Sequence, residues 1–504
     1  MNIRVRIAPS PTGLLHIGTV RTALSNYLFA KKNKGTFILR IEDTDKERSF
    51  PEYEANILSG LKNLGLTPDE GPENPGKYGP YRQSERTHIY RPYIEKLLEE
   101  GKAYHCFCTQ QELEKERENA QKNKIAFRYS GKCRNISLKE AMERREKGEK
   151  SVIRMIVPEN KDISFTDIIR GKTKQNTKDL TGDMVIAKDL STPLYNFVVV
   201  IDDHLMEISH VIRGEDHLSN TPKQILIYEV FGWDIPQFAH LPLILNEDRS
   251  KLSKRKNSVS VDDYISNGYL KEALINFLIL LGWNDGTEKE IYSLEELEKC
   301  FSLERVGKAG AVFDIKRLNW INQQYIKMMT DRKLAQEVFP LLIKENRISK
   351  IFEADDPFAF EIVNTKEQYH IDDLANWVRH EKERINRVTE LVEALDFYFV
   401  HIPEYDKDLL LHKGKIEKKV ALFALEEVLN IFEKTEDFSE ENIKTILIEK
   451  IAEWGLSNGE VLWPIRAALT GKERSPGAFE MATTLGKEKS IQRIEEGIKK
   501  LQEK

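Results

Sequence analysis

The first sixty residues alternate between strand-like and helix-like patterns, and this order constrains the fold more than any other feature. Residues 3–7 alternate and are rich in β-branched side chains, which is typical of a strand. A turn cluster of Pro, Ser, Thr and Gly occupies 9–13, and apolar residues then recur at helical spacing over 18–32. A second strand over 36–41 and a second helix over 52–64 repeat the order. Strands that alternate with helices predict a parallel sheet with covered faces.

The next part of the chain changes character between about residues 85 and 180. It holds three cysteines, a highly charged helical stretch over 110–124 and few long apolar runs. We expect an insertion here that takes no part in the sheet. Strand-like sequence returns at 195–202 and 210–213, followed by a helix from about residue 221. The sheet is therefore predicted to be split in sequence and rejoined in space.

Beyond Trp320 the composition becomes helical. Apolar residues recur at helical intervals over 333–344, 388–399 and 418–432, with little glycine between them. The last third is therefore predicted to be an all-α appendage.

Composition excludes several classes of protein. The 504 residues are 32% charged and 40% hydrophobic, which permits substantial cores and argues against bulk disorder. The sequence contains no apolar run of about 20 residues, so no membrane span is predicted. The first ten residues are not followed by the apolar core of a signal peptide. The net charge of −5 excludes a wholly basic surface but leaves room for a local basic face. Four cysteines are no disulfide framework in so long a chain, so a reducing compartment is expected.

Residues 10–19, between the first strand and the first helix, carry the first chemical signal. A helix N-terminus gathers unpaired N–H groups and favours phosphate. Gly13 and Gly18 allow close approach of a ligand, and His16 offers a donor to a phosphate oxygen. Alone, such a pattern more often marks a plain turn with a solvated histidine.

Residues 251–256, far downstream, form a short basic run. An isolated basic run is more often a solvated surface loop. Placed over the first segment, however, its cations could neutralise a triphosphate as pyrophosphate leaves, which stabilises the transition state.

Together the two segments resemble the HIGH and KMSKS motifs of class I aminoacyl-tRNA synthetases. Thr19 stands where the second His of the first motif would be, and Leu252 where the Met of the second would be. Further stretches are similar to bacterial glutamyl-tRNA synthetases, and the resemblance runs from Ile3 to past Thr470. These stretches are 6–13, 39–45, 81–86, 211–217 and 466–471.

The resemblance implies ATP-dependent ligation of L-glutamate to the 3′ end of tRNA(Glu), through a glutamyl adenylate, with release of AMP and diphosphate. The substrate complex is ATP with Mg²⁺, which needs no dedicated protein cage. Because no covalent protein intermediate forms, the protein contributes positioning and charge stabilisation. A cytoplasmic monomer without a membrane partner is expected. Whether tRNA(Gln) is also charged stays open.

The implied fold class is α/β, with a Rossmann-type catalytic domain, an insertion and an α-helical C-terminal region. The implied domains are 1–85, the first half of the catalytic domain; 86–190, an inserted domain that binds the acceptor stem; 191–245, the second catalytic half; 246–325, a stem-contact region with the KMSKS-like loop; and 326–504, an anticodon-binding region.

The resemblance also implies site residues. The catalytic candidates are His16, Thr19, Lys251, Ser253 and Lys254. The ATP candidates are Pro11, Gly13, His16, Gly18 and Lys254. Glutamate carries two carboxylates and one ammonium, so its pocket needs two cations and one anion, and arginine suits carboxylates through its planar geometry. The glutamate candidates are Arg6, Ser10, Glu42, Tyr195 and Arg213. Which arginine takes the side-chain carboxylate stays open.

The three clustered cysteines suit a structural zinc, which takes four ligands. They are Cys106, Cys108 and Cys133. Some members of the resembled family add a His two residues later, where this chain has Asn135. A related shorter enzyme has Tyr-x-x-x-Cys, which Tyr129 matches here, and His105 is a further candidate. Without metal, the cysteines would pack as small apolar residues.

RNA contacts are expected on several faces, because phosphate neutralisation dominates affinity. The acceptor end would meet Arg128, Lys132 and Arg134, whereas Arg379, Arg384 and Arg387 individually fit solvated helix faces better. Three alternatives remain. A glutaminyl enzyme would carry β-barrel anticodon domains, a glutamyl-queuosine enzyme would be far shorter, and a non-catalytic tRNA-binding paralogue would have lost phosphate-binding residues.

Overall fold

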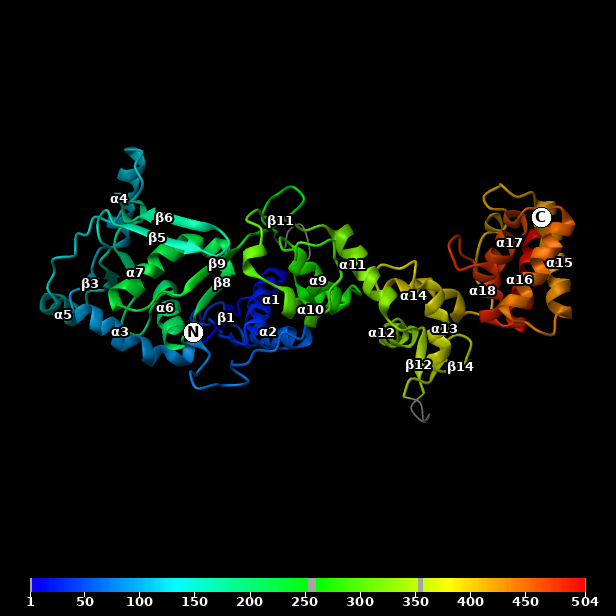
Figure 1. The fold of residues 1–504 in the computed structure, drawn as a ribbon, viewed down its shortest axis with the longest axis horizontal. Coiled ribbons are helices and arrows are strands. Elements are labelled where there is room, and N and C mark those ends of the chain that lie inside the picture. The colour runs from blue at the N-terminus through cyan, green and yellow to red at the C-terminus, as the bar shows by residue number, and fades with distance from the viewer. Residues whose placement is uncertain (1, 253–259, 352–356, 504) are drawn as a thin grey trace. The chain divides into compact units, whose positions relative to one another are not determined.

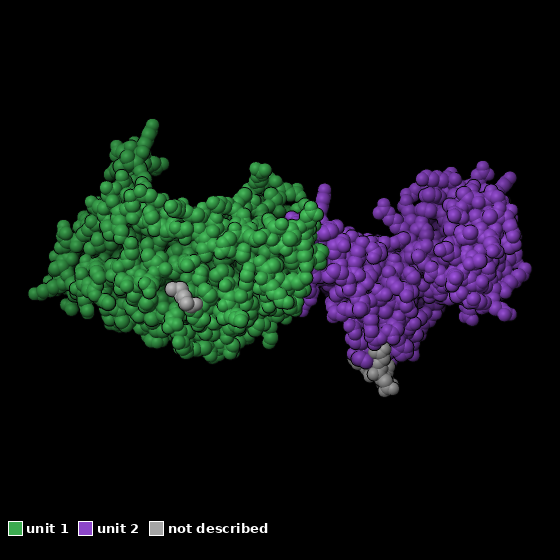
Figure 2. Space-filling model, viewed as in Figure 1, with its two compact units in different colours: residues 1–264, 274–315 green, residues 265–273, 316–504 purple. Residues whose placement is uncertain are grey.

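The computed structural model describes residues 2–252, 260–351 and 357–503. The chain divides into two compact units, shown in different colours in Figure 2. Unit 1 comprises residues 1–264 and 274–315, and unit 2 comprises 265–273 and 316–504. The five predicted domains are finer than this division, and their boundaries stay predictions.

The centre of unit 1 is the predicted sheet, with helix α1 packed on it (Figure 1). Strands β1 and β2 pair in parallel, as do β8 and β9. Strand β1 continues alongside β8, where Ser209 N donates to Arg4 O at 3.0 Å. The two ladders that contain these pairs, β1–β2 and β8–β9, are separate in their strand pairing but lie side by side at β1 and β8. Segments far apart in sequence are thus brought together in space, as predicted. The elements are β1 (Arg4–Ile7), α1 (Ile17–Lys32), β2 (Thr36–Leu39), β8 (His210–Gly214) and β9 (Gln237–Leu241).

Strand β5 (Asp162–Asp167) contradicts the expectation that the insertion stays out of this sheet. It pairs in parallel with β9 at Asp167 and Phe238, and in antiparallel with β6 (Gly171–Asn176). Its apolar residues Ile163 and Phe165 alternate with polar ones, so one face can join a core. Four residues of alternation inside a charged segment were too short a signal to predict this strand.

Helix α6 (Tyr195–Leu205) occupies the segment predicted as a strand over 195–202, and that prediction is wrong. All residues from Phe197 to Asp203 are buried. A helix buried on every side shows a continuous apolar run, which periodicity alone cannot distinguish from a buried strand.

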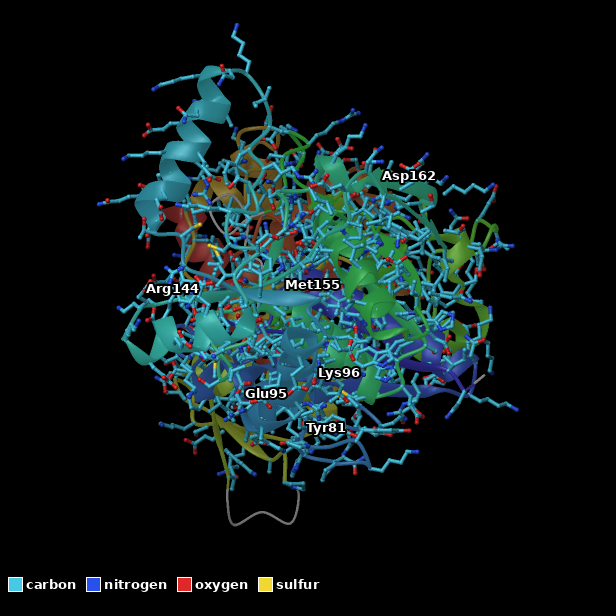
Figure 3. The ribbon with its side chains drawn as sticks, turned by 90° about the vertical axis from the view of Figure 1, so that its left-hand side faces the viewer. Tyr81, Glu95, Lys96, Arg144, Met155 and Asp162 are labelled. Atoms are coloured by element: carbon cyan, nitrogen blue, oxygen red, sulfur yellow. The ribbon has the colours of Figure 1, made fainter. Side chains whose placement is uncertain are left out.

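The rest of the inserted segment forms an antiparallel sheet in the order β3–β4–β7. Figure 3 looks onto this end of unit 1 and shows α4 standing out from the body, with charged side chains around it. Thr109 caps α4 through a capping box with Glu112, which explains why so polar a helix begins there. The elements are α3 (Thr87–Glu99), β3 (Ala103–Cys106), α4 (Gln110–Lys122), α5 (Leu138–Glu146), β4 (Val152–Met155) and β7 (Met184–Ala187).

Further elements complete unit 1 or lead from one unit to the other. They are α2 (Pro51–Asn63), α7 (Thr221–Phe231), β10 (Ile244–Leu245), α8 (Val261–Ser266), α9 (Lys271–Leu280), α10 (Leu294–Cys300) and β11 (Ala311–Val312).

Unit 2 is mainly helical, as predicted, but its described residues also contain a three-stranded antiparallel sheet, so the prediction of an all-α appendage is wrong in this detail. Strands of two or three residues are too short to leave a periodic pattern. The helix expected over 388–399 is interrupted after Ala394. The strands are β12 (Ile348–Lys350), β13 (Phe360–Ile362) and β14 (Gln368–Tyr369). The helices are α11 (Ile315–Met328), α12 (Asp331–Lys344), α13 (Ile371–Glu381), α14 (Glu390–Ala394), α15 (Lys418–Lys434), α16 (Glu440–Trp454), α17 (Asn458–Thr470), α18 (Ala478–Leu485) and α19 (Lys487–Gln502).

Among the described helices of both units, none combines the length and the apolar character that crossing a membrane requires.

Candidate active site

A cavity of about 700 Å³ opens in unit 1 at the carboxyl ends of β1 and β8 and at the first turn of α1. In an open α/β sheet this edge is the usual place for a ligand. Most of the predicted site residues line the cavity, although they come from segments up to 245 positions apart. These residues are Arg6, Ser10, His16, Gly18, Thr19, Glu42, Tyr195, Arg213 and Lys251. The structure thus brings them together, while their individual roles remain predictions.

Four predicted residues are not placed at the cavity. Pro11 and Gly13 are not among its lining residues, whereas Ser10 and His16 on either side of them are. Ser253 and Lys254 lie outside the described residues.

The described residues on both sides of 253–259 lie beside the first motif. Lys251 and Leu252 line the cavity, and Lys251 Nζ lies 3.4 Å from Asp216 Oδ2. On the other side, Ser260 forms a β-bridge with His16, and Val261 N donates to Leu15 O at 3.1 Å. The described residues that flank 253–259 on both sides are therefore close to the first motif.

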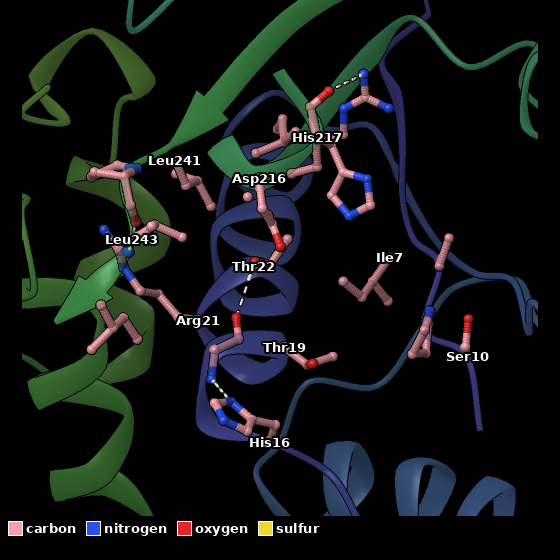
Figure 4. Close-up of a pocket in the computed structure, with 18 of the residues that line it drawn as sticks. Ile7, Ser10, His16, Thr19, Arg21, Thr22, Asp216, His217, Leu241 and Leu243 are labelled. Atoms are coloured by element: carbon pink, nitrogen blue, oxygen red, sulfur yellow. Dashed lines mark hydrogen bonds between the residues drawn. The ribbon is translucent and has the colours of Figure 1, made fainter. Parts of the chain in front are cut away.

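His16 is the N-cap residue of α1, as Figure 4 shows together with Thr19 and Thr22 on the same helix. Its Nδ1 accepts a hydrogen bond from Gly18 N at 2.9 Å. Nδ1 can accept only without a proton, so Nε2 carries the proton of this imidazole. The helix N-terminus adds a partial positive charge at the same place. Both features favour an anionic ligand.

Two of the lining residues, Arg6 and Glu42, belong to a buried charge network. The Asp203 carboxylate accepts from Arg6 Nε at 3.0 Å and from Arg40 Nη1 at 2.7 Å, and Arg40 Nη2 donates to Glu42 at 3.2 Å. Although burial opposes ionisation, the two arginines hold the pKa of Asp203 below its ordinary value. Burial raises the pKa of Glu42, against the effect of Arg40 and Arg6.

Arg40 and Asp203 were not predicted from the sequence. The signal that could have indicated Asp203 is a pair of acids, Asp202 and Asp203, that directly follows an apolar run. Two adjacent acids at the end of a buried segment require cationic partners in the core.

Arg213, on β8, is held differently from Arg6. Its Nε donates to His240 Nε2 at 3.1 Å and its Nη2 to Thr221 Oγ1 at 2.8 Å. Its Nη1 is buried and has no hydrogen-bond partner, and Arg213 forms no ion pair with any described carboxylate. Burial lowers the pKa of Arg213. A buried cation that keeps one unused donor in a cavity wall suits an anionic ligand.

Tyr195 begins α6 at the mouth of the cavity and is partly exposed. Its hydroxyl lies 3.1 Å from Nδ1 of His217, which is the residue labelled near Asp216 in Figure 4. Burial and the nearby Arg213 lower the pKa of His217 to about 4, so this imidazole is neutral at physiological pH. Tyr195 and His217 therefore offer polar, uncharged groups to a ligand.

The predicted metal ligands also come together, away from the cavity. The Sγ atoms of Cys106, Cys108 and Cys133 lie within 4.8 Å of one another. Tyr129 Oη lies 3.3 Å from Cys106 Sγ and 3.5 Å from Cys108 Sγ. His105 instead lies near Ser151, with Nδ1 and Oγ 3.1 Å apart, because alternate residues of β3 face opposite sides.

Two of the predicted acceptor-stem residues are engaged within the protein. Arg134 forms a bidentate ion pair with Asp183, with both N···O distances at 2.6 Å, and Lys132 pairs with Glu112 at 2.6 Å. Arg128 donates weakly to Thr177 O at 3.5 Å. Arg134 therefore has a structural role, which weakens it as an RNA contact.

Comparison with known proteins defines the class of this chain. The family described as tRNA synthetases class I (E and Q), catalytic domain, matches residues 2–320, and an anticodon binding domain family matches 333–498. The first match spans more than half of the chain. The class is therefore that of the class I tRNA synthetases.

Individual relatives narrow this class. The chain is 44% identical over 501 residues to glutamate–tRNA ligase 2 of Caldicellulosiruptor saccharolyticus, and 99% of each chain is covered. It is 45% identical over 507 residues to the glutamate–tRNA ligase of Carboxydothermus hydrogenoformans, covering 98% of this chain and 99% of that one. The solved glutamate tRNA ligase of Elizabethkingia meningosepticum, in complex with its amino acid, superimposes with a TM-score of 0.87 at 37% identity, covering 99% of both chains. The chain belongs to the glutamate–tRNA ligase family.

Proposed function

We propose that the cavity of unit 1 activates L-glutamate with ATP as glutamyl adenylate, and that the glutamyl group then passes to the 3′ end of tRNA(Glu). Membership of the glutamate–tRNA ligase family supports this reaction. AMP and diphosphate are the other products. Mg²⁺ enters with ATP as part of the substrate complex.

The phosphates bind at the N-terminus of α1. His16 Nε2 donates to a phosphate oxygen, since Nδ1 is already an acceptor of the Gly18 N–H. Thr19 and Lys251 line the same cavity and add a hydroxyl and a cation. Charge builds up on the departing diphosphate, and these fixed donors stabilise it without reorganisation. Ser253 and Lys254 of the second motif also add a hydroxyl and a cation that stabilise this charge.

Glutamate binds between the two buried arginines. Arg213 takes the side-chain carboxylate, because it is a buried cation that keeps an unused donor and has no described carboxylate partner. Arg6 already holds Asp203 and contributes mainly to the shape and charge of the pocket. Glu42 faces the ammonium group, and Ser10 and Tyr195 complete the polar lining. The unused Nη1 of Arg213 is the observation that carries this assignment.

The experiment replaces Arg213 with glutamine and measures aminoacylation of tRNA(Glu). Truncating one partner of a buried charge pair costs at least about 2 kcal/mol, so the KM for glutamate should rise roughly 30-fold or more. The KM for ATP should change little. Arg91→Gln on the exposed face of α3 removes the same charge and serves as the matched control. An unchanged glutamate KM in Arg213→Gln removes this residue from the pocket.

Three finer points belong to the same proposal. Unit 2 binds the anticodon loop of tRNA(Glu), in keeping with its anticodon binding domain match, and tRNA(Gln) is an alternative substrate to be tested by charging each tRNA. The enzyme works as a monomer. It works in the cytoplasm, where its four free cysteines stay reduced.

The cysteine cluster holds a structural zinc ion, with Tyr129 as fourth ligand. Zn–S bonds of about 2.3 Å in a tetrahedron place sulfurs roughly 3.8 Å apart. The Sγ atoms of Cys108 and Cys133 are already 3.7 Å apart. Tyr129 Oη lies 3.5 Å from Cys108 Sγ and 3.3 Å from Cys106 Sγ, whereas Asn135 is exposed. When bound, the ion would cross-link β3 to the loop that carries Tyr129 and Cys133.

A further inference from the structure

His240, the fourth residue of β9, is completely buried and does not line the cavity, although its neighbour Leu241 does. It nevertheless lies between two charged groups. Its Nδ1 lies 2.6 Å from Asp167 Oδ2, and its Nε2 lies 3.1 Å from Arg213 Nε. His240 therefore cannot touch a substrate and can act only through Arg213.

The hydrogen bonds define which nitrogen of His240 carries the proton. Arg213 Nε is always a donor, so Nε2 of His240 must be the acceptor and Nδ1 must carry the proton. Asp167 fixes that arrangement from the other side, because its Oδ2 can only accept. Burial lowers the pKa of His240 against the effect of Asp167, which agrees with a neutral ring.

Asp167 is itself held by the backbone. Its Oδ1 accepts from Ile169 N at 2.9 Å and from Arg170 N at 2.8 Å, and the residue is 1% exposed. It ends β5, the strand that the insertion contributes to the central sheet. Arg170 reinforces the turn by donating to Lys308 O at 2.7 Å. The series of hydrogen bonds from Asp167 through His240 to Arg213 thus spans three neighbouring strands, β5, β9 and β8.

We propose that Asp167 and His240 are positioning residues that hold the Arg213 guanidinium in the orientation that binds the carboxylate of glutamate. Nε and Nη2 of Arg213 are both engaged, by His240 and Thr221, so Nη1 is its one guanidinium nitrogen without a partner among the described residues, in a residue that lines the cavity. An arginine fixed at two nitrogens loses little side-chain entropy when it binds. The inference rests on the proposed role of Arg213 in glutamate binding.

The test compares two substitutions of His240. The amide of glutamine reaches the place of Nε2, so His240→Gln keeps an acceptor for Arg213. The amide of asparagine reaches only the place of Nδ1, so His240→Asn loses that acceptor. Losing a hydrogen bond to a charged group should raise the glutamate KM about tenfold in His240→Asn. We expect His240→Gln to stay within about threefold of the wild type, by the same hydrogen-bond argument. Both should keep the wild-type KM for ATP and kcat at saturating glutamate.

Asp167→Asn is the second variant, in case His240→Asn does not fold. Its Oδ1 can still accept from the backbone, but its amide donor faces Nδ1 of His240. The proton of His240 then moves to Nε2. Nε2 can no longer accept the hydrogen bond from Arg213 Nε, because two N–H groups now face each other. A rise in glutamate KM similar to that of His240→Asn supports the proposal.

Arg213→Gln, measured alongside, separates the possible failures. If it raises the glutamate KM while His240→Asn and Asp167→Asn leave it unchanged, the positioning role is wrong and the proposed function stands. If Arg213→Gln itself leaves the glutamate KM unchanged, the role of Arg213 fails and the positioning role fails with it. Equal rises in the KM values for glutamate and ATP in both His240 variants would show general disruption and also overturn the proposal.

Discussion

Single residues in both units owe their protonation state to burial and to their nearest partners. In unit 1, His16 keeps its proton on Nε2 because Gly18 N–H occupies Nδ1. In unit 2, burial governs the protonation of Glu381, which is 5% exposed at the C-terminal end of α13. Burial raises its pKa to about 7, although Arg384 and Lys472 lower it. The negative end of the helix dipole disfavours the carboxylate further.

Glu381 should make unit 2 less stable as the pH rises. The folded state binds the proton more tightly than the unfolded state, so the stabilisation is complete below pH about 4.5 and is lost as the pH rises through about 7. Glu381→Gln removes the free-energy cost of burying an ionised carboxylate at high pH. At pH 8 it should raise the free energy of unfolding by up to roughly 3 kcal/mol, at about 1.4 kcal/mol per pKa unit.

Scanning calorimetry at pH 5, 6.5 and 8 checks this prediction. The gain in Tm of Glu381→Gln over the wild type should be largest at pH 8 and should shrink toward pH 5. Glu426→Gln, at an exposed position of α15, is the control and should show no such trend. A gain that is independent of pH would contradict the raised pKa.

At the scale of helices and strands, the sequence predicted β1, α1, β2, α2, β8 and α7 because each has a clear period or a sharp turn signal. It did not predict α6, whose apolar residues Phe197 to Ile201 are buried on all sides and hide the helical period. Nor did it predict β5, because four alternating residues in a charged segment carry little signal. The motif residues of the cavity, such as His16 and Lys251, followed from spacing and resemblance.

Asp167 and His240 show why the remaining site residues could not be predicted. They lie at the ends of short strands, with no motif around them, and their importance comes from a contact across 73 positions of sequence. Only the pairing of β5 with β9 brings them together.

The cysteine cluster connects β3 with two loops of the insertion, and metal should therefore stabilise this region. Purified without chelator, the protein should contain about one zinc ion per chain, as four ligands form one tetrahedral site. Cys133→Ser should lose the metal and lower the Tm. Tyr129→Phe should bind zinc more weakly, because one of four ligands is lost.

Elemental analysis by mass spectrometry and thermal melting measure these effects. Cys300→Ser removes a thiol that is not part of the cluster and is the matched control, with unchanged zinc content. Zinc content that is the same in Cys133→Ser and the wild type would assign the metal to another place. A metal-free wild type would favour the alternative that the cysteines pack as small apolar side chains.

At the scale of the whole molecule, each unit has its own cavity with cationic side chains. Unit 1 holds the cavity with buried cations, and unit 2 holds a second cavity of about 730 Å³ whose lining includes four basic and four acidic residues. The basic residues of this second cavity are Arg384, Arg466, Lys472 and Arg474. Arg466 supports the cavity from within, since its guanidinium lies 4.4 Å from the ring of Trp463 and donates to Glu473 O. Arginine side chains in a hollow of a domain that matches an anticodon binding family suit the phosphates and bases of unpaired RNA.

Removing two exposed cations of this hollow should weaken tRNA binding without affecting the chemistry in unit 1. We expect Arg384→Ala combined with Arg474→Ala to raise the KM for tRNA(Glu) while the KM values for glutamate and ATP stay unchanged. Each lost phosphate contact in single-stranded RNA should reduce the slope of log KM against log salt by about 0.7. Lys418→Ala combined with Lys419→Ala removes the same charge from the exposed start of α15 and is the control. A salt slope that falls equally in both double variants would indicate general electrostatic attraction, whereas a fall confined to the Arg384 and Arg474 pair would locate the contact in this hollow.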